Sequence, residues 1–241
     1  MEFSTYNESS LHHTLKTLYS ELYDGKTEVP LDGHIYDIVT KKGNIIEIQT
    51  KNLCQLYNKI EDTINHKRNI KIVHPIPIIK TIETYDKDHN LISKRKSPVK
   101  GTIYDIFKEL TKIYPYLLNK HFSLEIVEVN LIEERLKTDK PVQTKNKSRR
   151  FKKDWIKTDK KLQEIITTKR FNKVEDYLAL LPSTLPEEFS NKELRETLKE
   201  TKSAPAKFYN SCNIITWLFS RMNIIEETEK KARSHYYKIK K

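Results

Sequence analysis

Apolar residues between residues 8 and 131 recur with helical spacing in some segments and with strand-like alternation in others. Leu11, Leu15, Leu18 and Leu22 mark one face of a helix over 8–23. The same reasoning predicts further helices at 52–66 and 102–112, strands at 27–31, 69–74 and 123–131, and hairpins at 37–49 and 80–96. The strand at 69–74 is expected to end at Pro75. Because a helix separates 45–49 from 70–73, these strands are expected to be parallel neighbours in a mixed α/β core.

The pattern changes after residue 136. Residues 137–158 carry many cations and few apolar residues, which predicts a basic linker between a core of residues 1–136 and a smaller domain of residues 159–241. In the smaller domain the spacing predicts helices at 160–168, 172–180, 191–200 and 205–221, then strands at 224–227 and 235–239. Ser190 and Glu193 have the spacing of a capping box. Helix, turn, helix and hairpin in this order resemble a winged helix-turn-helix, whose second helix enters the major groove of DNA.

Charge and cysteine content narrow the class of protein. The 241 residues include 45 Lys and Arg against 33 Asp and Glu, a net charge of +12 that favours a polyanionic partner such as nucleic acid. An AT-rich genome, which enriches Lys, Asn and Ile, is the plainer explanation of the same excess. Cys54 and Cys212 are isolated, so we expect a reduced cytoplasmic protein without a zinc site. A polar N-terminus and the lack of an apolar run of about 18 residues predict neither signal peptide nor membrane span.

The hairpin at 37–49 carries the most informative chemistry. Gly43 and Asn44 supply a tight turn, which would bring Asp37 close to Glu47 on the opposite strand. Two carboxylates among apolar neighbours are costly unless a cation neutralises them, and oxygen ligands suit Mg²⁺ or Mn²⁺. The alternative is an edge hairpin whose carboxylates form weak surface pairs with Lys41 or Lys42.

This hairpin resembles the PD-(D/E)XK nuclease superfamily, whose pattern is an acidic residue on one strand and Glu-x-Lys or Glu-x-Gln on the next. Asp37, Glu47 and Gln49 match its three positions, and Glu8 lies where the family often adds a helical Glu. Lysine is commoner at the third position, and Lys51, on the same side of the strand, could supply the missing charge. The resemblance covers residues 7–132.

The resemblance implies a restriction-endonuclease-like mixed sheet core, followed here by the smaller, mostly helical winged-helix domain. It implies that Asp37 and Glu47 hold Mg²⁺ or Mn²⁺ with the Ile48 carbonyl as a third ligand. Gln49 and Lys51 would then orient the attacking water and the scissile phosphate. The expected activity is hydrolysis of DNA, with duplex favoured, in restriction, defence or repair. Many such nucleases cut duplexes as homodimers.

Isolated histidines carry less weight because no partner spacing supports them. This applies to His12, His13 and His34, while His74 lies near the carboxyl edge of the predicted sheet, where sites often form.

Basic residues in three regions are candidates for nucleic-acid contacts. They are Lys94, Arg95, Lys96 and Lys100 before a helix start, Arg149 and Arg150 in the basic segment, and Lys202, Lys207, Asn210, Lys230, Lys231 and Arg233 in the winged-helix region. Phe151 and Trp155 interrupt the basic segment, where they could stack on bases or dock the segment on a core. Solvated charged loops are the alternative for all of these.

Two other functions fit the sequence. One is a DNA-binding or regulatory protein whose nuclease-like core is inactive, which is consistent with Gln49. The other is an RNA-directed enzyme or an interaction module.

Overall fold

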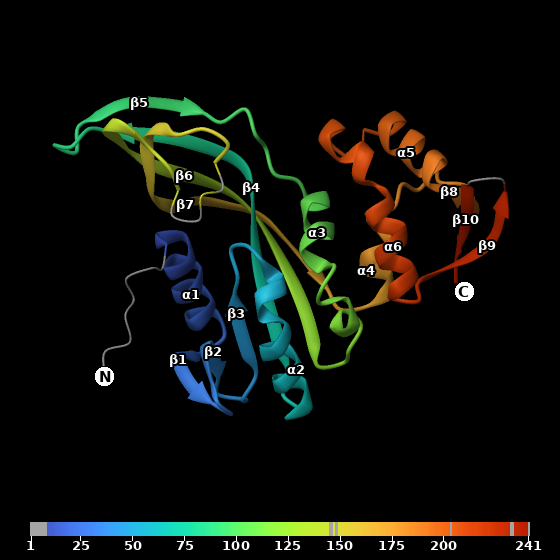
Figure 1. The fold of residues 1–241 in the computed structure, drawn as a ribbon. Helices are drawn as coiled ribbons and strands as arrows, with labels where there is room; N and C mark the ends of the chain where they lie inside the picture. Colours follow the sequence, from blue (N-terminus) through green and yellow to red (C-terminus); the bar gives the residue numbers. More distant parts are fainter. Residues whose placement is uncertain (1–8, 145–146, 148, 203, 232–233, 241) are drawn as a thin grey trace.

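The computed structural model describes residues 9–144, 147, 149–202, 204–231 and 234–240. Its main element is a seven-stranded mixed sheet in the order β1-β2-β3-β4-β6-β7, with β5 paired to β4 (Figure 1). The strands are β1 (Gly25–Leu31), β2 (His34–Thr40), β3 (Ile45–Ile48), β4 (Ile70–Tyr85), β5 (Leu91–Lys96), β6 (Phe122–Val142) and β7 (Lys153–Phe171). β3, β4 and β6 are parallel, so the expected mixed α/β core and the β3–β4 crossover are confirmed.

Helices cover both faces of this sheet. On one face, α1 (Ser10–Leu22) buries Leu11, Leu15 and Tyr19 against β2, β3 and β6. On the other face lie η1 (Leu53–Leu56), α2 (Tyr57–Asn65), η2 (Ile103–Asp105), α3 (Ile106–Leu110) and η3 (Tyr114–Tyr116). The Ser9 side chain accepts a hydrogen bond from the His12 amide and caps α1. Helices therefore cover both faces of the sheet near β3, where the carboxylates lie.

The expected end of a strand at Pro75 is wrong, because β4 continues to Tyr85. The carbonyl of Val73 accepts from the Gln49 amide at 2.9 Å, and that of Pro77 accepts from the Gly101 amide at 2.8 Å. The carbonyls of Val73 and Pro77 both point away from β6. Pro75 lies two residues from each, so its backbone faces the same side of the strand. The prolines therefore direct their nitrogens to the side that β3 leaves open after Ile48, where no ladder donor is required.

The predicted basic linker at 137–158 and helix at 160–168 are also wrong. Residues 137–142 end β6 and residues 153–168 belong to β7, and the two strands pair antiparallel from Leu124↔Phe171 to Val142↔Lys153. Ile165, Ile166, Thr167 and Thr168 are β-branched and favour a strand once β6 offers an edge to pair with. We call the ends of β4, β6 and β7 together with β5 the arm; it curves over the start of α1 (Figure 1).

The C-terminal elements are α4 (Val174–Leu178), β8 (Glu188–Ser190), α5 (Asn191–Glu200), η4 (Ala206–Ser211), α6 (Asn213–Arg221), β9 (Ile225–Lys231) and β10 (Ser234–Ile239). The capping box of Ser190 and Glu193 is confirmed, and the helix predicted at 205–221 divides at Cys212 into η4 and α6. The three strands form a second sheet in the order β8-β10-β9. The winged-helix assignment of this region stays a prediction.

The C-terminal elements pack on the first sheet's helices through aromatic side chains. The ring of Phe107 on α3 lies 6.0 Å from that of Phe208 and 5.9 Å from that of Phe219. One hydrophobic cluster therefore runs from β4 and β6 through α3 into α5 and α6. Among the helices that the structure describes, none has the length and apolar character needed to cross a bilayer.

Candidate active site

The strands β2 and β3 separate just after the Ile38–Ile46 pair, and two carboxylates fill the gap. The Asp37 amide donates to Glu47 Oε1 at 3.0 Å, and the Ile48 amide donates to Asp37 Oδ2 at 2.7 Å. Each acidic side chain thus takes a backbone donor that the ladder would otherwise use. The expectation that the hairpin brings Asp37 to Glu47 is confirmed.

Two basic side chains from the flanking helices reach this pair. Lys59 on α2 places its Nζ 2.7 Å from Glu47 Oε1 and 2.6 Å from the Ile35 carbonyl oxygen. His12 on α1 places its Nε2 3.4 Å from Asp37 Oδ2. The Lys41 side chain pairs with Asp24 instead, so the alternative of a carboxylate pair held by Lys41 is wrong. Side chains from the helices on both faces of the sheet therefore contact the two carboxylates.

Burial and mutual repulsion push the two carboxylates toward different protonation states. Burial, and then the charge of Asp37, raises the pKa of Glu47 from 4.5 to about 7, against the opposing pull of Lys59. Burial also acts to raise the pKa of Asp37, but His12, the Ile48 amide and Lys59 outweigh it and hold that pKa below its ordinary value. Asp37 is therefore the ionised member of the pair near neutral pH, and Glu47 is the member that takes up a proton more readily.

One oxygen of each carboxylate remains available to a ligand. Asp37 Oδ1 and Glu47 Oε2 have no hydrogen-bond partner among the described residues. The Asp37 side chain is 17% exposed and that of Glu47 is 5% exposed, so a ligand would reach the pair from the Asp37 side. A divalent cation would fit this set of oxygens and would offset the repulsion that raises the Glu47 pKa. No group of three His, Cys, Asp or Glu side chains suited to a metal occurs in the part of the chain that the structure describes.

The structure places the other predicted site residues differently. The Gln49 side chain donates to the Asn52 carbonyl at 3.3 Å, so it stabilises its own loop. The Gln49 carbonyl accepts from His74 Nδ1 at 2.6 Å. Lys51 is exposed in the same loop. Glu8 lies outside the described residues.

Lys59 is the site residue that the sequence analysis missed. It follows the buried Leu56 by three residues and precedes the buried Ile60, so it lies at the border of the helix face that packs on the sheet. That position is the only local signal, and many surface lysines share it. His12 received little weight for the same reason: only the packing of α1 on β2 brings it to Asp37.

A basic surface on the arm adjoins the start of α1. Glu133 Oε2 lies 3.5 Å from Lys80 Nζ and 2.7 Å from Lys157 Nζ, and Arg135 is 2.5 Å from Glu133 Oε1. Burial, followed by the charges of Lys157, Lys51 and Lys80, lowers the pKa of the neighbouring Lys160. We call Lys80, Lys157 and Lys160 on the arm, together with Lys51 in the loop after β3, the arm lysine cluster. Lys80, Lys157 and Arg135 all pair with Glu133, so this surface keeps an excess of positive charge that suits a polyanion.

The start of α1 connects this surface to the carboxylate pair. Asp159 on β7 accepts from the Ser10 amide at 2.9 Å and from the Ser10 hydroxyl. His12, two residues further along α1, contacts Asp37. The arm lysine cluster and the carboxylates therefore lie at the same end of α1.

The predicted contacts on β5 and in the basic segment lie elsewhere on the arm. Arg95, Lys96 and Lys100 are exposed, while Lys94 pairs with Glu83 at 2.9 Å. The Arg149 and Arg135 guanidinium groups lie 4.0 Å and 3.6 Å from the centre of the Trp155 ring. Arg150 lies 5.1 Å from the centre of the Phe151 ring, which is exposed. Of these two aromatic residues, Trp155 docks within the arm and Phe151 is open to a partner.

Of the nucleic-acid contacts predicted in the winged-helix region, one is bonded within the protein and three are exposed. Lys207 donates to the Lys100 carbonyl at 3.1 Å and pairs with Asp105 at 2.9 Å, so it joins η4 to η2. Lys202, Asn210 and Lys230 are exposed. Arg233 and the side chain of Lys231 lie outside the described residues.

The other histidines considered in the sequence analysis do not contact the carboxylate pair in any described interaction. His34 pairs with Asp62 on α2 at 2.9 Å, and His13 is exposed on α1. Burial lowers the pKa of His74 on β4, which holds the Gln49 carbonyl.

Comparison with known proteins finds one family and one relative. Residues 9–172 match the family described as "Domain of unknown function (DUF8091)". An uncharacterized protein of Treponema pallidum (strain Nichols) is 32% identical over 197 residues, which cover 82% of this chain and 75% of that protein. No solved structure matches the chain. The matched family segment contains the carboxylate pair, Lys59, His12 and the arm lysine cluster.

Proposed function

The chain belongs to the family described as a domain of unknown function, DUF8091, and we propose that it is a metal-dependent enzyme that hydrolyses phosphodiester bonds in DNA. The observation that carries the proposal is the carboxylate pair of Asp37 and Glu47. They meet where two strands separate, and each keeps one oxygen without a hydrogen-bond partner among the described residues. The adjoining arm lysine cluster supports a polyanionic substrate.

Each residue at the pair has a definable task in such an enzyme. Asp37 Oδ1 and Glu47 Oε2 would hold Mg²⁺ or Mn²⁺, with the Ile48 carbonyl as a further ligand. The bound ion would lower the pKa of a water and offset charge that develops on the phosphate. Lys59 fixes the second oxygen of Glu47 and favours its ionised form, while His12 orients Asp37.

The rest of the chain would hold the substrate. The arm lysine cluster would contact backbone phosphates beside the pair, and the exposed Arg95 and Lys96 would extend that contact along β5. The C-terminal elements would present Lys202, Asn210 and Lys230 to duplex DNA in the manner of a winged helix. Two copies of the chain would allow both strands to be cut.

Cleavage by the purified protein tests the proposal. Plasmid, single-stranded DNA and RNA are incubated with Mg²⁺, Mn²⁺ or EDTA, with Asp37→Asn and Glu47→Gln beside the unmodified protein. Asp24→Asn is the matched control, because Asp24 is an exposed carboxylate that pairs with Lys41 away from the pair. We expect metal-dependent cleavage that both site variants lose and the control keeps. Cleavage that survives in either site variant would refute the assignment.

A second function, DNA binding without cleavage, is favoured by Gln49. This residue stands where lysine is commoner in the nucleases that the hairpin resembles, and its amide is bonded to Asn52. In this case the arm lysine cluster would still bind DNA, and the carboxylate pair would be a remnant. Salt-sensitive binding with no cleavage under any metal would favour this function.

A further inference from the structure

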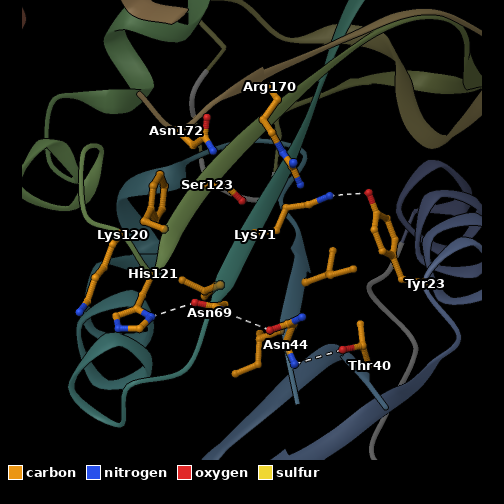
Figure 2. A pocket seen from close by; sticks show the side chains of 14 residues that line it. Tyr23, Thr40, Asn44, Asn69, Lys71, Lys120, His121, Ser123, Arg170 and Asn172 are labelled. Carbon is orange, nitrogen blue, oxygen red and sulfur yellow. Dashed lines mark hydrogen bonds between the residues drawn. The ribbon is translucent and has the colours of Figure 1, made fainter. Parts of the chain in front are cut away.

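A cavity of about 290 Å³ opens where β3, β4 and β6 begin, at the other end of α1 from the carboxylate pair (Figure 2). Its wall includes Tyr23, the residue that caps the C-terminus of α1. Tyr23 follows His12 by eleven positions, a rise of about 16 Å along the helix. A small ligand bound here would therefore not touch Asp37 or Glu47.

The charged residues that line the cavity are basic. No Asp or Glu is among its lining residues, whereas Lys71 and Arg170 are. Lys71 is held in place by its hydrogen bonds to the Tyr23 hydroxyl at 2.5 Å and to Glu125 Oε2 at 3.0 Å. Arg170 is exposed and forms no ion pair with any residue that the structure describes. Lys120 also lines the cavity but turns its amine away from these groups (Figure 2).

Most of the hydrogen-bonding capacity left over in this cavity is donor capacity; the Asn172 side-chain oxygen, unpaired among the described residues, is an acceptor. The side-chain oxygen of Asn44 already accepts from Asn69 at 3.0 Å, and that of Asn69 is bonded to His121 at 2.8 Å. The side-chain NH₂ groups of Asn44 and Asn172 and the Ser123 hydroxyl have no partner within the described ranges. Such a set favours a ligand rich in acceptors.

We propose that this cavity binds the phosphate group of a small phosphomonoester, about the size of a nucleoside monophosphate. A phosphate offers several acceptor oxygens for the positioned Lys71 donor, whose charge Glu125 offsets, and a charge that matches Arg170, which has no ion pair among the described residues. The bonds from Lys71 to Tyr23 and Glu125 keep the ammonium group positioned before a ligand arrives, which lowers the cost of binding. A cavity of this size is at the lower end of those that hold small molecules, roughly 300–1,000 Å³. The inference does not depend on hydrolysis at the carboxylate pair.

Calorimetric titration of the full chain tests this site. The probes are inorganic phosphate, adenosine 5′-monophosphate and adenosine, at constant ionic strength set with chloride. Arg170→Gln removes the exposed cation, and Ser123→Ala removes one donor without disturbing the buried Lys71. Lys169→Gln is the matched control, since this neighbouring strand residue pairs with Glu128 and does not line the cavity.

We expect saturable binding of phosphate and of the monophosphate but not of adenosine. Arg170→Gln should weaken it about tenfold and Ser123→Ala severalfold, while Lys169→Gln stays within about twofold, in line with the strength of charge-assisted hydrogen bonds. Asp37→Asn should bind phosphate normally, which separates this site from the proposed hydrolysis. The absence of saturable binding to the unmodified chain, or equal affinity in Arg170→Gln, would overturn the inference. Binding of oligonucleotides alone, lost in Arg170→Gln, would also overturn it and assign the cavity to a nucleic-acid surface.

Discussion

The raised pKa of Glu47 predicts that its ionisation destabilises the fold, so Glu47→Gln should be more stable than the unmodified protein at alkaline pH. The glutamine keeps an oxygen for the Asp37 amide and for Lys59 but carries no charge. It therefore mimics the protonated glutamate at every pH. What the variant removes is the ionised form, which burial and Asp37 disfavour.

The magnitude follows from the difference between the two pKa values. A rise from 4.5 to about 7 corresponds to about 3 kcal/mol, at about 1.4 kcal/mol for each pH unit. Because the folded-state pKa is raised, the stabilising contribution is complete below pH 4.5 and is lost as the pH rises through 7. From pH 5 to pH 8 the unmodified protein should lose about 2 to 3 kcal/mol of unfolding free energy relative to Glu47→Gln.

Urea unfolding at pH values from 5 to 8, without and with Mg²⁺ or Mn²⁺, measures this difference. A cation that binds only the folded protein at 100 times its Kd adds about 2.7 kcal/mol. It should therefore restore the unmodified protein at pH 8 and leave Glu47→Gln unchanged. Glu21→Gln on α1 is the control, since Glu21 is exposed and its side chain makes no contact with any described residue. Unfolding free energies of Glu47→Gln and the unmodified protein that run parallel across this pH range would refute the reasoning.

Three further variants test the site. Lys59→Met should reduce hydrolysis at least about 100-fold and shift its pH profile upward, because Lys59 lowers the Glu47 pKa; a profile that keeps its midpoint would contradict this. Gln49→Lys should keep or raise the rate, measured as initial cleavage, and a loss of activity would argue against the nuclease resemblance. Lys160→Gln should weaken DNA binding and reduce the salt slope by about 1, whereas the exposed Lys26→Gln should change neither; equal slopes in titrations at several salt concentrations would exclude the arm lysine cluster from the interface.

The sequence by itself determined the parts of this protein whose signals are local. The leucine spacing of α1, the capping box of α5 and the hairpin of β2 and β3 all follow from neighbours within a few residues. The approach of Asp37 to Glu47 follows from the same hairpin, because its turn sets the register of the two strands. Apolar periodicity around one intervening helix was also enough for the parallel pairing of β3 with β4.

Tertiary structure decided what depends on partners distant along the chain. Pro75 reads locally as a strand end, yet it is accommodated in β4 because β3 stops at Ile48 and leaves that edge open. The local sequence of β7 predicts a linker and a helix. These residues form a strand because the long edge of β6 is available to pair with them. Lys59 and His12 reach the carboxylates from two helices on opposite faces of the sheet, an arrangement without a sequence period. The cavity beside Lys71 likewise forms where five separate segments meet, so no local pattern could reveal it.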